Sequence, residues 1–243
     1  GNRMVTKLRL LERFVNRTDF ADYEDFKKNL QISIPEKFNF AFDVVDEYAR
    51  LQPEKRALVW CNDHAEEKIL TFGELSKLSN KAANFFINAG IGKGDKVLLI
   101  LKRRWEFWVC VMGLHKIGAV AIPGSHMLTG RDLIYRNNCA QVKMILTVSD
   151  SNVIGHVNDC YDESPSLIAK ACLGGSRPGW IDFDAGLENA SDVFEKPDDF
   201  ACDSDPLLIF FTSGTTGMPK MVLHNHQYPV GHILTAAFWQ NVI

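Results

Sequence analysis

The sequence predicts an α/β fold with a mostly parallel sheet flanked by helices. Short apolar runs alternate along the chain with longer segments whose apolar residues recur at helical spacing, which is typical of repeated strand–helix–strand units. Some of these runs, such as 97–101, are apolar at every position, as in strands whose two faces are both covered by helices. The 243 residues are enough for one large hydrophobic core or two smaller ones.

The start of the chain is expected to be helical. Residues 1–37 carry mixed charges and scattered aromatic side chains, and they predict a helical lead-in that is closed by Pro35. A helix with one buried face is then predicted over 38–51, where Pro53 ends the pattern. The apolar residues that recur at helical spacing in it are Phe38, Ala41, Phe42, Val45 and Ala49.

A β-hairpin and a capped helix are predicted next. The strand-like runs 57–61 and 68–72 flank a polar stretch that suits a turn. Thr71 then opens a helix, because Glu74 stands three residues later and each side chain can accept a hydrogen bond from the other's backbone N–H. The helix is expected to end at Gly90. Its buried stripe consists of Leu75, Leu78, Ala82, Phe85 and Ala89.

Strands and helices are predicted to alternate after this point. The strands expected from apolar runs are 97–101, 118–123, 142–148 and 167–173. The helices expected between them are 105–116, 129–139 and 152–161. This order predicts parallel strands joined by helical crossovers.

The chain is expected to divide into four parts. After the lead-in of residues 1–37, residues 38–173 form an α/β lobe. The polar segment 174–206 is expected to be a connecting loop region, and loops of that length are usually functional or mobile. We place a soft boundary there and expect 207–243 to begin a second lobe.

Composition restricts the partners and the compartment. The formal net charge is -3, with 27 basic and 30 acidic side chains, so no broad positive field attracts nucleic acid. No apolar run reaches the roughly 18 to 20 residues that span a bilayer, and the first residues lack the apolar core of a signal peptide. The six cysteines lack metal-site spacing, which favours reduced thiols. We expect a cytoplasmic protein with no integral membrane segment, no metal site and no nucleic acid partner.

The strongest functional signal follows the apolar run 207–211. It is the segment Thr212-Ser-Gly-Thr-Thr-Gly-Met-Pro-Lys220, in which Gly214 and Gly217 let the backbone turn sharply and approach a ligand. Backbone N–H groups of such a turn can converge on an anion, and Lys220, expected on an exposed loop, adds a positive charge. Hydroxyl donors for phosphate oxygens come from Thr212, Ser213, Thr215 and Thr216. The segment predicts a phosphate-binding loop.

Other interpretations of the glycine-rich segments fit less well. In a Walker A loop the lysine directly follows the second glycine and precedes a hydroxyl residue. Here Lys220 stands three residues after Gly217, and Met221 follows it. The stretch 90–94 misses the dinucleotide spacing G-x-G-x-x-G and precedes a strand instead of following one. A turn without a ligand would leave four hydroxyl groups and a lysine after a buried strand unexplained.

The segment 212–220 resembles, at all nine positions, the signature T-S-G-T-T-G-x-P-K of the adenylate-forming enzymes. That superfamily includes acyl-CoA synthetases, luciferases and the adenylation domains of peptide synthetases. Upstream segments similar to recurring family segments are 70–75, 92–97 and 116–123, so that the similarity covers residues 38–243. The segments 123–125 and 132–136, together with His224, look most like the medium-chain acyl-CoA synthetase branch.

This resemblance implies that the parent protein is an ATP-dependent acyl-CoA synthetase, an acid–thiol ligase. A medium-chain or aromatic carboxylic acid would attack the α-phosphate of MgATP to give an acyl-adenylate, and coenzyme A would then take the acyl group. The implied cofactors are ATP, Mg²⁺ and coenzyme A. The implied catalytic residues are Lys220, Thr216 and His224. The implied nucleotide-binding residues are Thr212, Ser213, Gly214, Thr215, Thr216, Gly217 and Lys220.

Several alternatives stay open. The chain could belong to a non-catalytic nucleotide-binding module or to an amino-acid adenylation domain. His224 and His226 could instead flank a helix or form a weak metal pair, and Phe238 and Trp239 belong either to the core or to an acyl tunnel. The family's aromatic-Gly-x-Thr-Glu segment, ribose-binding aspartate, hinge and C-terminal lysine do not occur before Ile243. The chain is therefore expected to be the N-terminal part of a longer protein and to be inactive by itself.

Overall fold

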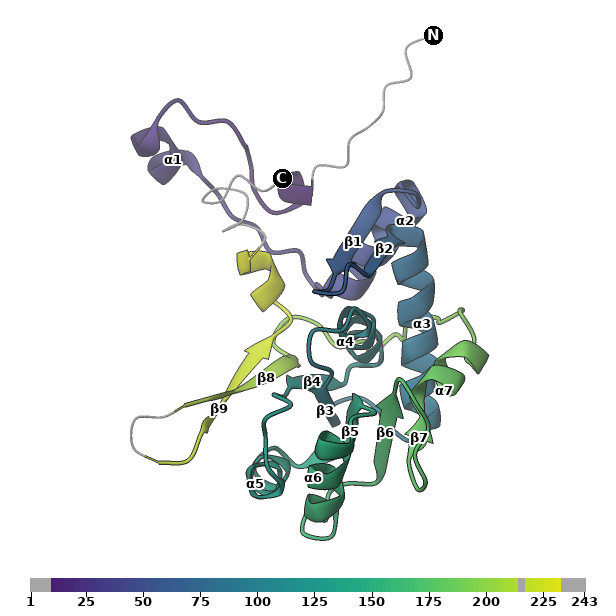
Figure 1. The fold of residues 1–243 in the computed structure, drawn as a ribbon. Helices are drawn as coiled ribbons and strands as arrows, with labels where there is room; N and C mark the ends of the chain where they lie inside the picture. The colour runs from purple at the N-terminus through teal and green to yellow at the C-terminus, as the bar shows by residue number, and fades with distance from the viewer. Residues whose placement is uncertain (1–9, 214–216, 233–243) are drawn as a thin grey trace.

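A seven-stranded sheet forms the centre of the protein (Figure 1). The structure is a computed structural model that describes residues 10–213 and 217–232. The strands are β3 Lys96–Ile100, β4 Val120–Pro123, β5 Val142–Val148, β6 Ala169–Leu173, β7 Ile181–Asp182, β8 Pro206–Thr212 and β9 Lys220–Asn225. Their order across the sheet is β7-β6-β5-β3-β4-β8-β9, and neighbours are parallel except for the antiparallel pair β8 and β9. The prediction of an α/β fold with a mostly parallel sheet is confirmed.

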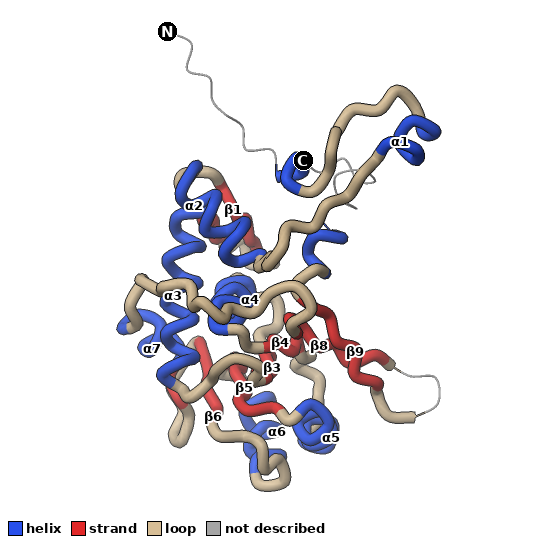
Figure 2. Tube along the Cα trace, turned by 180° about the vertical axis from the view of Figure 1, so that it is seen from behind, coloured by secondary structure: helices blue, strands red, loops and turns tan. Residues whose placement is uncertain are grey.

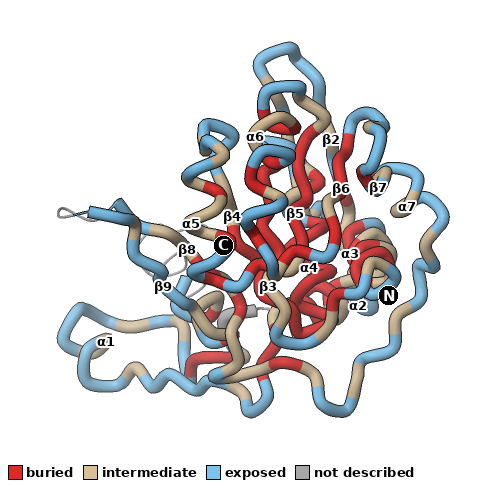
Figure 3. The backbone as a smooth tube through the Cα atoms, turned by 90° about the horizontal axis from the view of Figure 1, so that it is seen from below, coloured by how far each residue is buried: buried red, intermediate tan, exposed pale blue. Residues whose placement is uncertain are grey.

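Helices cover both faces of this sheet (Figures 1 and 2). On one face lie α3 Phe72–Asn88, α4 Glu106–Ile117 and α7 Phe183–Asn189, and on the other lie α5 Gly130–Ala140 and α6 Ser151–Tyr161. The central strands are consequently buried (Figure 3), and each side chain from Val97 to Ile100 is at most 1% exposed. Burying an aliphatic side chain contributes roughly 1.5 to 3 kcal/mol. The continuous apolar runs therefore hold the three layers together.

Local signals set the ends of the helices. At the start of α3, the backbone N–H of Glu74 donates to Thr71 Oγ1 at 3.2 Å, and that of Thr71 donates to Glu74 Oε2 at 3.3 Å. This confirms the predicted capping box, and α5 begins with the same reciprocal pair between Thr129 and Asp132. Such caps satisfy N–H groups that the helix leaves unpaired, and each contributes about 1 kcal/mol. At the other end of α4, Gly118 has a φ of 77°, a conformation that glycine adopts without a Cβ penalty.

A two-stranded hairpin and short helices precede the sheet. The strands β1 Arg56–Cys61 and β2 Glu67–Thr71 pair antiparallel, as predicted. The helix predicted over 38–51 is present as η2 Ala41–Asp46 followed by α2 Glu47–Leu51, and its first part is a π-helix. Asn39 begins it, because the backbone N–H of Ala41 donates to Asn39 Oδ1 at 3.0 Å.

The lead-in forms an arm at the edge of the molecule (Figure 1). Its described helices are η1 Leu10–Arg13 and α1 Tyr23–Asn29. Phe14 anchors the arm, since its buried ring packs 5.5 Å from the ring of Phe38 in a cluster that also contains Val230. The arm thus contacts the chain just beyond β9.

The segment 174–206, expected to be a loop, contains β7 and α7. Asp182 caps α7, because the backbone N–H of Ala185 donates to its Oδ1 at 3.2 Å, and the buried ring of Phe183 packs 4.9 Å from that of Phe85. The expectation of a plain loop is therefore wrong for 181–189. After this segment, β8 joins the same sheet beside β4, and the division into two lobes stays a prediction.

Candidate functional site

The first and last residues of the predicted phosphate-binding segment lie on the antiparallel strands β8 and β9 (Figures 1 and 2). Thr212 ends β8 and Lys220 begins β9, and the two residues are register partners. Thr212 Oγ1 donates a hydrogen bond to the backbone oxygen of Lys220 at 3.4 Å. Both side chains are exposed. The hairpin therefore brings a hydroxyl group and a cation to its open end.

The remaining motif residues are placed as follows. Ser213 is exposed directly after Thr212. Gly217 has a φ of 140° and open space where a Cβ would be, so the backbone conformation alone favours glycine there. Lys220 is exposed as predicted, but it begins a strand instead of lying in a loop, because its backbone pairs with Thr212. Outside the described residues lie Gly214, Thr215, Thr216, Phe238 and Trp239.

His224 lies on the same hairpin. It is four residues beyond Lys220 on β9, and side chains at this spacing on a strand point to the same face. Its half-buried ring lies 5.5 Å from the ring of Phe210 and 4.0 Å from that of Tyr228, measured between centroids. Two aromatic rings therefore contact the imidazole.

An apolar pocket of about 630 Å³ lies next to this histidine. Phe210 and Tyr228, the two aromatic residues that contact His224, also line the pocket. Helix α4 contributes Phe107, Trp108, Val111, Met112 and His115. The volume and the apolar lining suit a small hydrophobic ligand or ligand portion.

The buried residues His115, on α4, and His226, directly after β9, have ring centroids 5.5 Å apart. Burial, and next the neighbouring His226, lower the pKa of His115 to about 3. Burial lowers the pKa of His226 to about 4, although Asp205 and Asp203 act in the opposite direction. Both imidazoles are therefore neutral near pH 7. No sequence signal singled out His115, because the contact exists only once α4 packs near the hairpin.

Metal binding by His224 and His226 receives no support from their geometry. His226 is fully buried, whereas His224 is half-buried and packs against Tyr228. Across residues 10–213 and 217–232, no group of three or more His, Cys, Asp or Glu side chains could hold a metal ion. All six cysteines are free.

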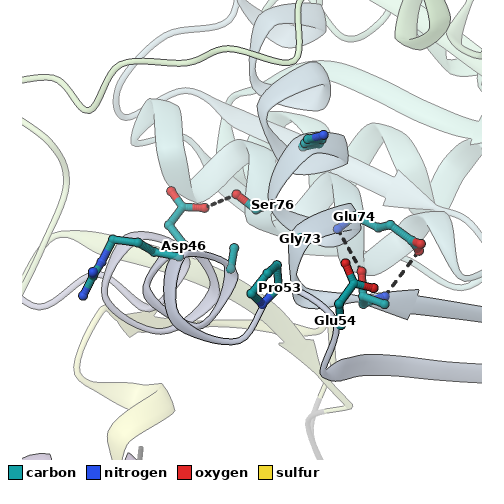
Figure 4. Close-up of a pocket in the computed structure, with 10 residues that line it drawn as sticks. Asp46, Pro53, Glu54, Gly73, Glu74 and Ser76 are labelled. Atoms are coloured by element: carbon teal, nitrogen blue, oxygen red, sulfur yellow. Dashed lines mark hydrogen bonds between the residues drawn. The ribbon is translucent and has the colours of Figure 1, made fainter.

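A second pocket, of about 460 Å³, lies between α2 and the start of α3 (Figure 4). Its charged lining residues are the carboxylates Asp46, Glu54 and Glu74 and the cations Arg50 and Lys77. Asp46 already accepts a hydrogen bond from Ser76 Oγ at 2.7 Å. Because its charges are of mixed sign and partly paired, we place the candidate site at the hairpin.

Comparison with known proteins shows the family to which the chain belongs. The family model described as AMP-binding enzyme matches residues 45–242, a range that includes the whole β8–β9 hairpin. The chain belongs to the AMP-binding enzyme family.

Curated relatives of this AMP-binding enzyme chain are acyl-coenzyme A synthetases. Human acyl-coenzyme A synthetase ACSM5 is 40% identical over 214 residues, which cover 85% of this chain and 36% of the relative. Mouse acyl-coenzyme A synthetase ACSM3 is 33% identical over 233 residues, covering 93% of this chain and 40% of the relative. The chain therefore spans less than half the length of these relatives.

Solved structures of a CoA ligase and an acyl-CoA synthetase share the fold of this chain. The anthranilate CoA ligase AuaEII in complex with anthranoyl-AMP superimposes with a TM-score of 0.74 at 23% identity, covering 86% of this chain and 38% of the ligase. A Brucella canis acyl-CoA synthetase gives a TM-score of 0.67 at 26% identity, covering 79% of this chain and 34% of the synthetase.

The expected cytoplasmic location is contradicted by these relatives. Human ACSM5 and mouse ACSM3 are both named as mitochondrial proteins. The expectation was drawn from charge and hydropathy, which distinguish membrane-spanning from other chains but do not separate a cytoplasmic from a mitochondrial protein. Within the described part of this AMP-binding enzyme, no helix combines the length and the apolar character needed to cross a bilayer.

Proposed function

We propose that the whole protein containing this chain is an ATP-dependent acyl-CoA synthetase. It joins a carboxylic acid to coenzyme A through an acyl-adenylate and releases pyrophosphate and AMP. The proposal concerns the whole protein, because the chain spans only 36% of human ACSM5 and 40% of mouse ACSM3. The names of both relatives support it.

The observation that carries this proposal is the pairing of Lys220 with Thr212 at the open end of the hairpin. The exposed ammonium and hydroxyl groups, with a glycine at a φ of 140° between them, fit the anionic tail of a nucleotide. Hydrogen bonds to a charged group are worth roughly 1.5 to 3 kcal/mol each. A few such bonds would hold a triphosphate firmly.

The first half-reaction brings one anion to another. A carboxylate oxygen attacks the α-phosphorus of MgATP, and the bond to the bridging β-phosphate oxygen breaks, so that pyrophosphate leaves. Cations and dipoles must offset the repulsion in such a displacement. We assign Lys220 to the charge on the leaving pyrophosphate, and Thr215 and Thr216 to hydrogen bonds with phosphate oxygens. A magnesium ion bound to the triphosphate would supply further positive charge to the phosphate oxygens.

In the second half-reaction the sulfur of coenzyme A attacks the acyl carbonyl carbon, and AMP leaves. We assign His224 to the acyl side of the site, because it lies on the face of β9 that carries Lys220 and contacts two rings of the apolar pocket. A strand face that carries Lys220 and His224 and leads to an apolar pocket suits a carboxylic acid with an apolar body. This favours a medium-chain fatty acid or an aromatic acid.

Exchange of labelled pyrophosphate into ATP by the whole protein tests the proposal. We expect exchange that depends on octanoate or benzoate, and thioester formation when coenzyme A is added. Exchange that depends on an amino acid instead would assign the protein to the peptide-synthetase type. ATP binding without any exchange would leave a non-catalytic nucleotide-binding module.

The role of Lys220 is tested by Lys220→Ala. Loss of one charge-assisted contact is expected to slow the exchange by about tenfold or more. Lys27→Ala is the matched control, since Lys27 is an exposed lysine of α1. An exchange rate in Lys220→Ala equal to that of the control would remove Lys220 from the mechanism.

A further inference from the structure

Helix α5 contacts the base of the phosphate-binding segment. The hydroxyl group of Tyr135 donates a hydrogen bond of 2.8 Å to the backbone oxygen of Pro219, the residue before Lys220. The neighbouring Arg136 has its Cζ 5.3 Å from the ring centroid of Phe211, the residue before Thr212. Two adjacent residues of one helix therefore contact β8 and the residue directly before β9, each one position away from a proposed nucleotide contact.

These contacts act at the end of the hairpin that bears the motif. β8 pairs with β4 through Ala121 and Leu208, and the motif begins four residues further along at Thr212. Helix α5 in turn is anchored by the capping box of Thr129 and Asp132 and by the fully buried Leu133. The partly buried hydrogen bond from Tyr135 thus connects Pro219, the residue directly before β9, to a helix that packs on the core.

We propose that Tyr135 is a positioning residue for the nucleotide. By holding the carbonyl group of Pro219, it fixes the backbone from which the side chain of Lys220 extends. Tyrosine suits this role because its rigid ring loses little conformational freedom when it is ordered. The inference rests on the proposed function, since it assigns Lys220 to the phosphates of ATP.

Tyr135→Phe tests the inference, because it removes the hydroxyl group and keeps the ring. Loss of one neutral hydrogen bond changes an equilibrium by about twofold to about tenfold. We expect the KM for MgATP to rise by that factor in the whole protein, while the KM for the carboxylic acid is unchanged. Tyr161→Phe is the matched control, since it deletes a hydroxyl group from α6, where the ring contacts Lys170.

A double variant separates positioning from general stability. If Tyr135 acts through Lys220, then Tyr135→Phe adds no further increase in the KM for MgATP once Lys220→Ala is present. A purely structural role predicts the same loss of active protein in both backgrounds, without a specific change in that KM.

The outcomes distinguish this inference from the proposed function. If the unchanged protein shows no pyrophosphate exchange with any acid, the proposed function fails. If it shows exchange and Tyr135→Phe has an unchanged KM for MgATP, or if the effects of the two substitutions simply multiply, the positioning role fails while the function stands.

Discussion

The ammonium group of Lys116 lies 2.8 Å from Asp46 Oδ1, although the lysine side chain is completely buried. The same group donates to Asn80 Oδ1 at 2.7 Å. Asp46 Oδ1 also accepts a hydrogen bond from Ser76 (Figure 4). One buried charge therefore links α4 to η2 and α3. Burial lowers the pKa of Lys116, and the nearby Asp46 opposes that effect.

We expect Asp46→Ala to destabilise the protein more than Lys116→Met. Removing the carboxylate leaves a buried ammonium group without its counter-ion, at a cost of about 3 kcal/mol. Replacing the lysine by an apolar side chain of similar length removes the charge itself and costs less. Urea unfolding of both single variants and of the double variant measures this. A greater loss in Lys116→Met would show that attraction between the two groups outweighs the burial penalty.

The buried pair His115 and His226 predicts a loss of stability in acid. Their folded pKa values of about 3 and about 4 lie below the unfolded value of 6.5, so the unfolded chain binds protons first as the pH falls. The two neutral imidazoles therefore make their full contribution to the free energy of unfolding above pH 6.5. Below pH 6.5 the contribution decreases by up to about 1.4 kcal/mol per pH unit for each imidazole.

Unfolding free energies measured at several values between pH 7.5 and pH 4 test this dependence. His226→Phe should give a shallower decrease than the unchanged protein. His64→Phe provides the control, because His64 is an exposed residue in the turn between β1 and β2. Equal slopes in the two variants would contradict the role of the buried pair.

Replacement by alanine is predicted to have opposite effects at two helical glycines, one packed against another helix and one with open space around it. A Cβ on Gly113 would lie 2.6 Å from the Cβ of Ala82 and 2.9 Å from the backbone nitrogen of Ala83. Gly113→Ala should therefore lower the free energy of unfolding by about 1 to 3 kcal/mol. Gly155 lies within α6 with nothing near its Cβ position, so Gly155→Ala should raise it by roughly 0.5 to 1 kcal/mol. Thermal unfolding compares the two, and a destabilised Gly155→Ala would contradict the packing argument.

Local signals in the sequence predicted most of the sheet and its helices. The reciprocal caps of Thr71 with Glu74, and the apolar run that became β3, depend on residues close together in the chain. The strand β9 was not predicted, because its residues Met221, Val222 and Leu223 do not alternate in polarity. Pairing with β8, rather than a pattern of its own, makes this segment a strand.

The candidate site was only partly predictable, because some of its contacts join residues far apart in the chain. The motif from Thr212 to Lys220 is continuous in the chain and is recognisable without a structure. The contacts of Tyr135 and His115 with the hairpin region come from helices far earlier in the sequence. The resemblance to medium-chain acyl-CoA synthetases included the segment 132–136, which contains Tyr135, but implied no role for this residue. The spacing of residues in a sequence does not reveal which helix packs beside a given loop.

The hydrogen bond between Tyr135 and Pro219 joins residues that are 84 positions apart. Contacts of such large separation close long loops, and the lost chain entropy delays them relative to contacts between neighbouring elements. The strand–helix units around β3 to β6 are connected by short segments and are free to assemble first. In refolding, the hairpin should therefore dock in a late kinetic phase, and nucleotide affinity should appear only after most of the helical signal has returned.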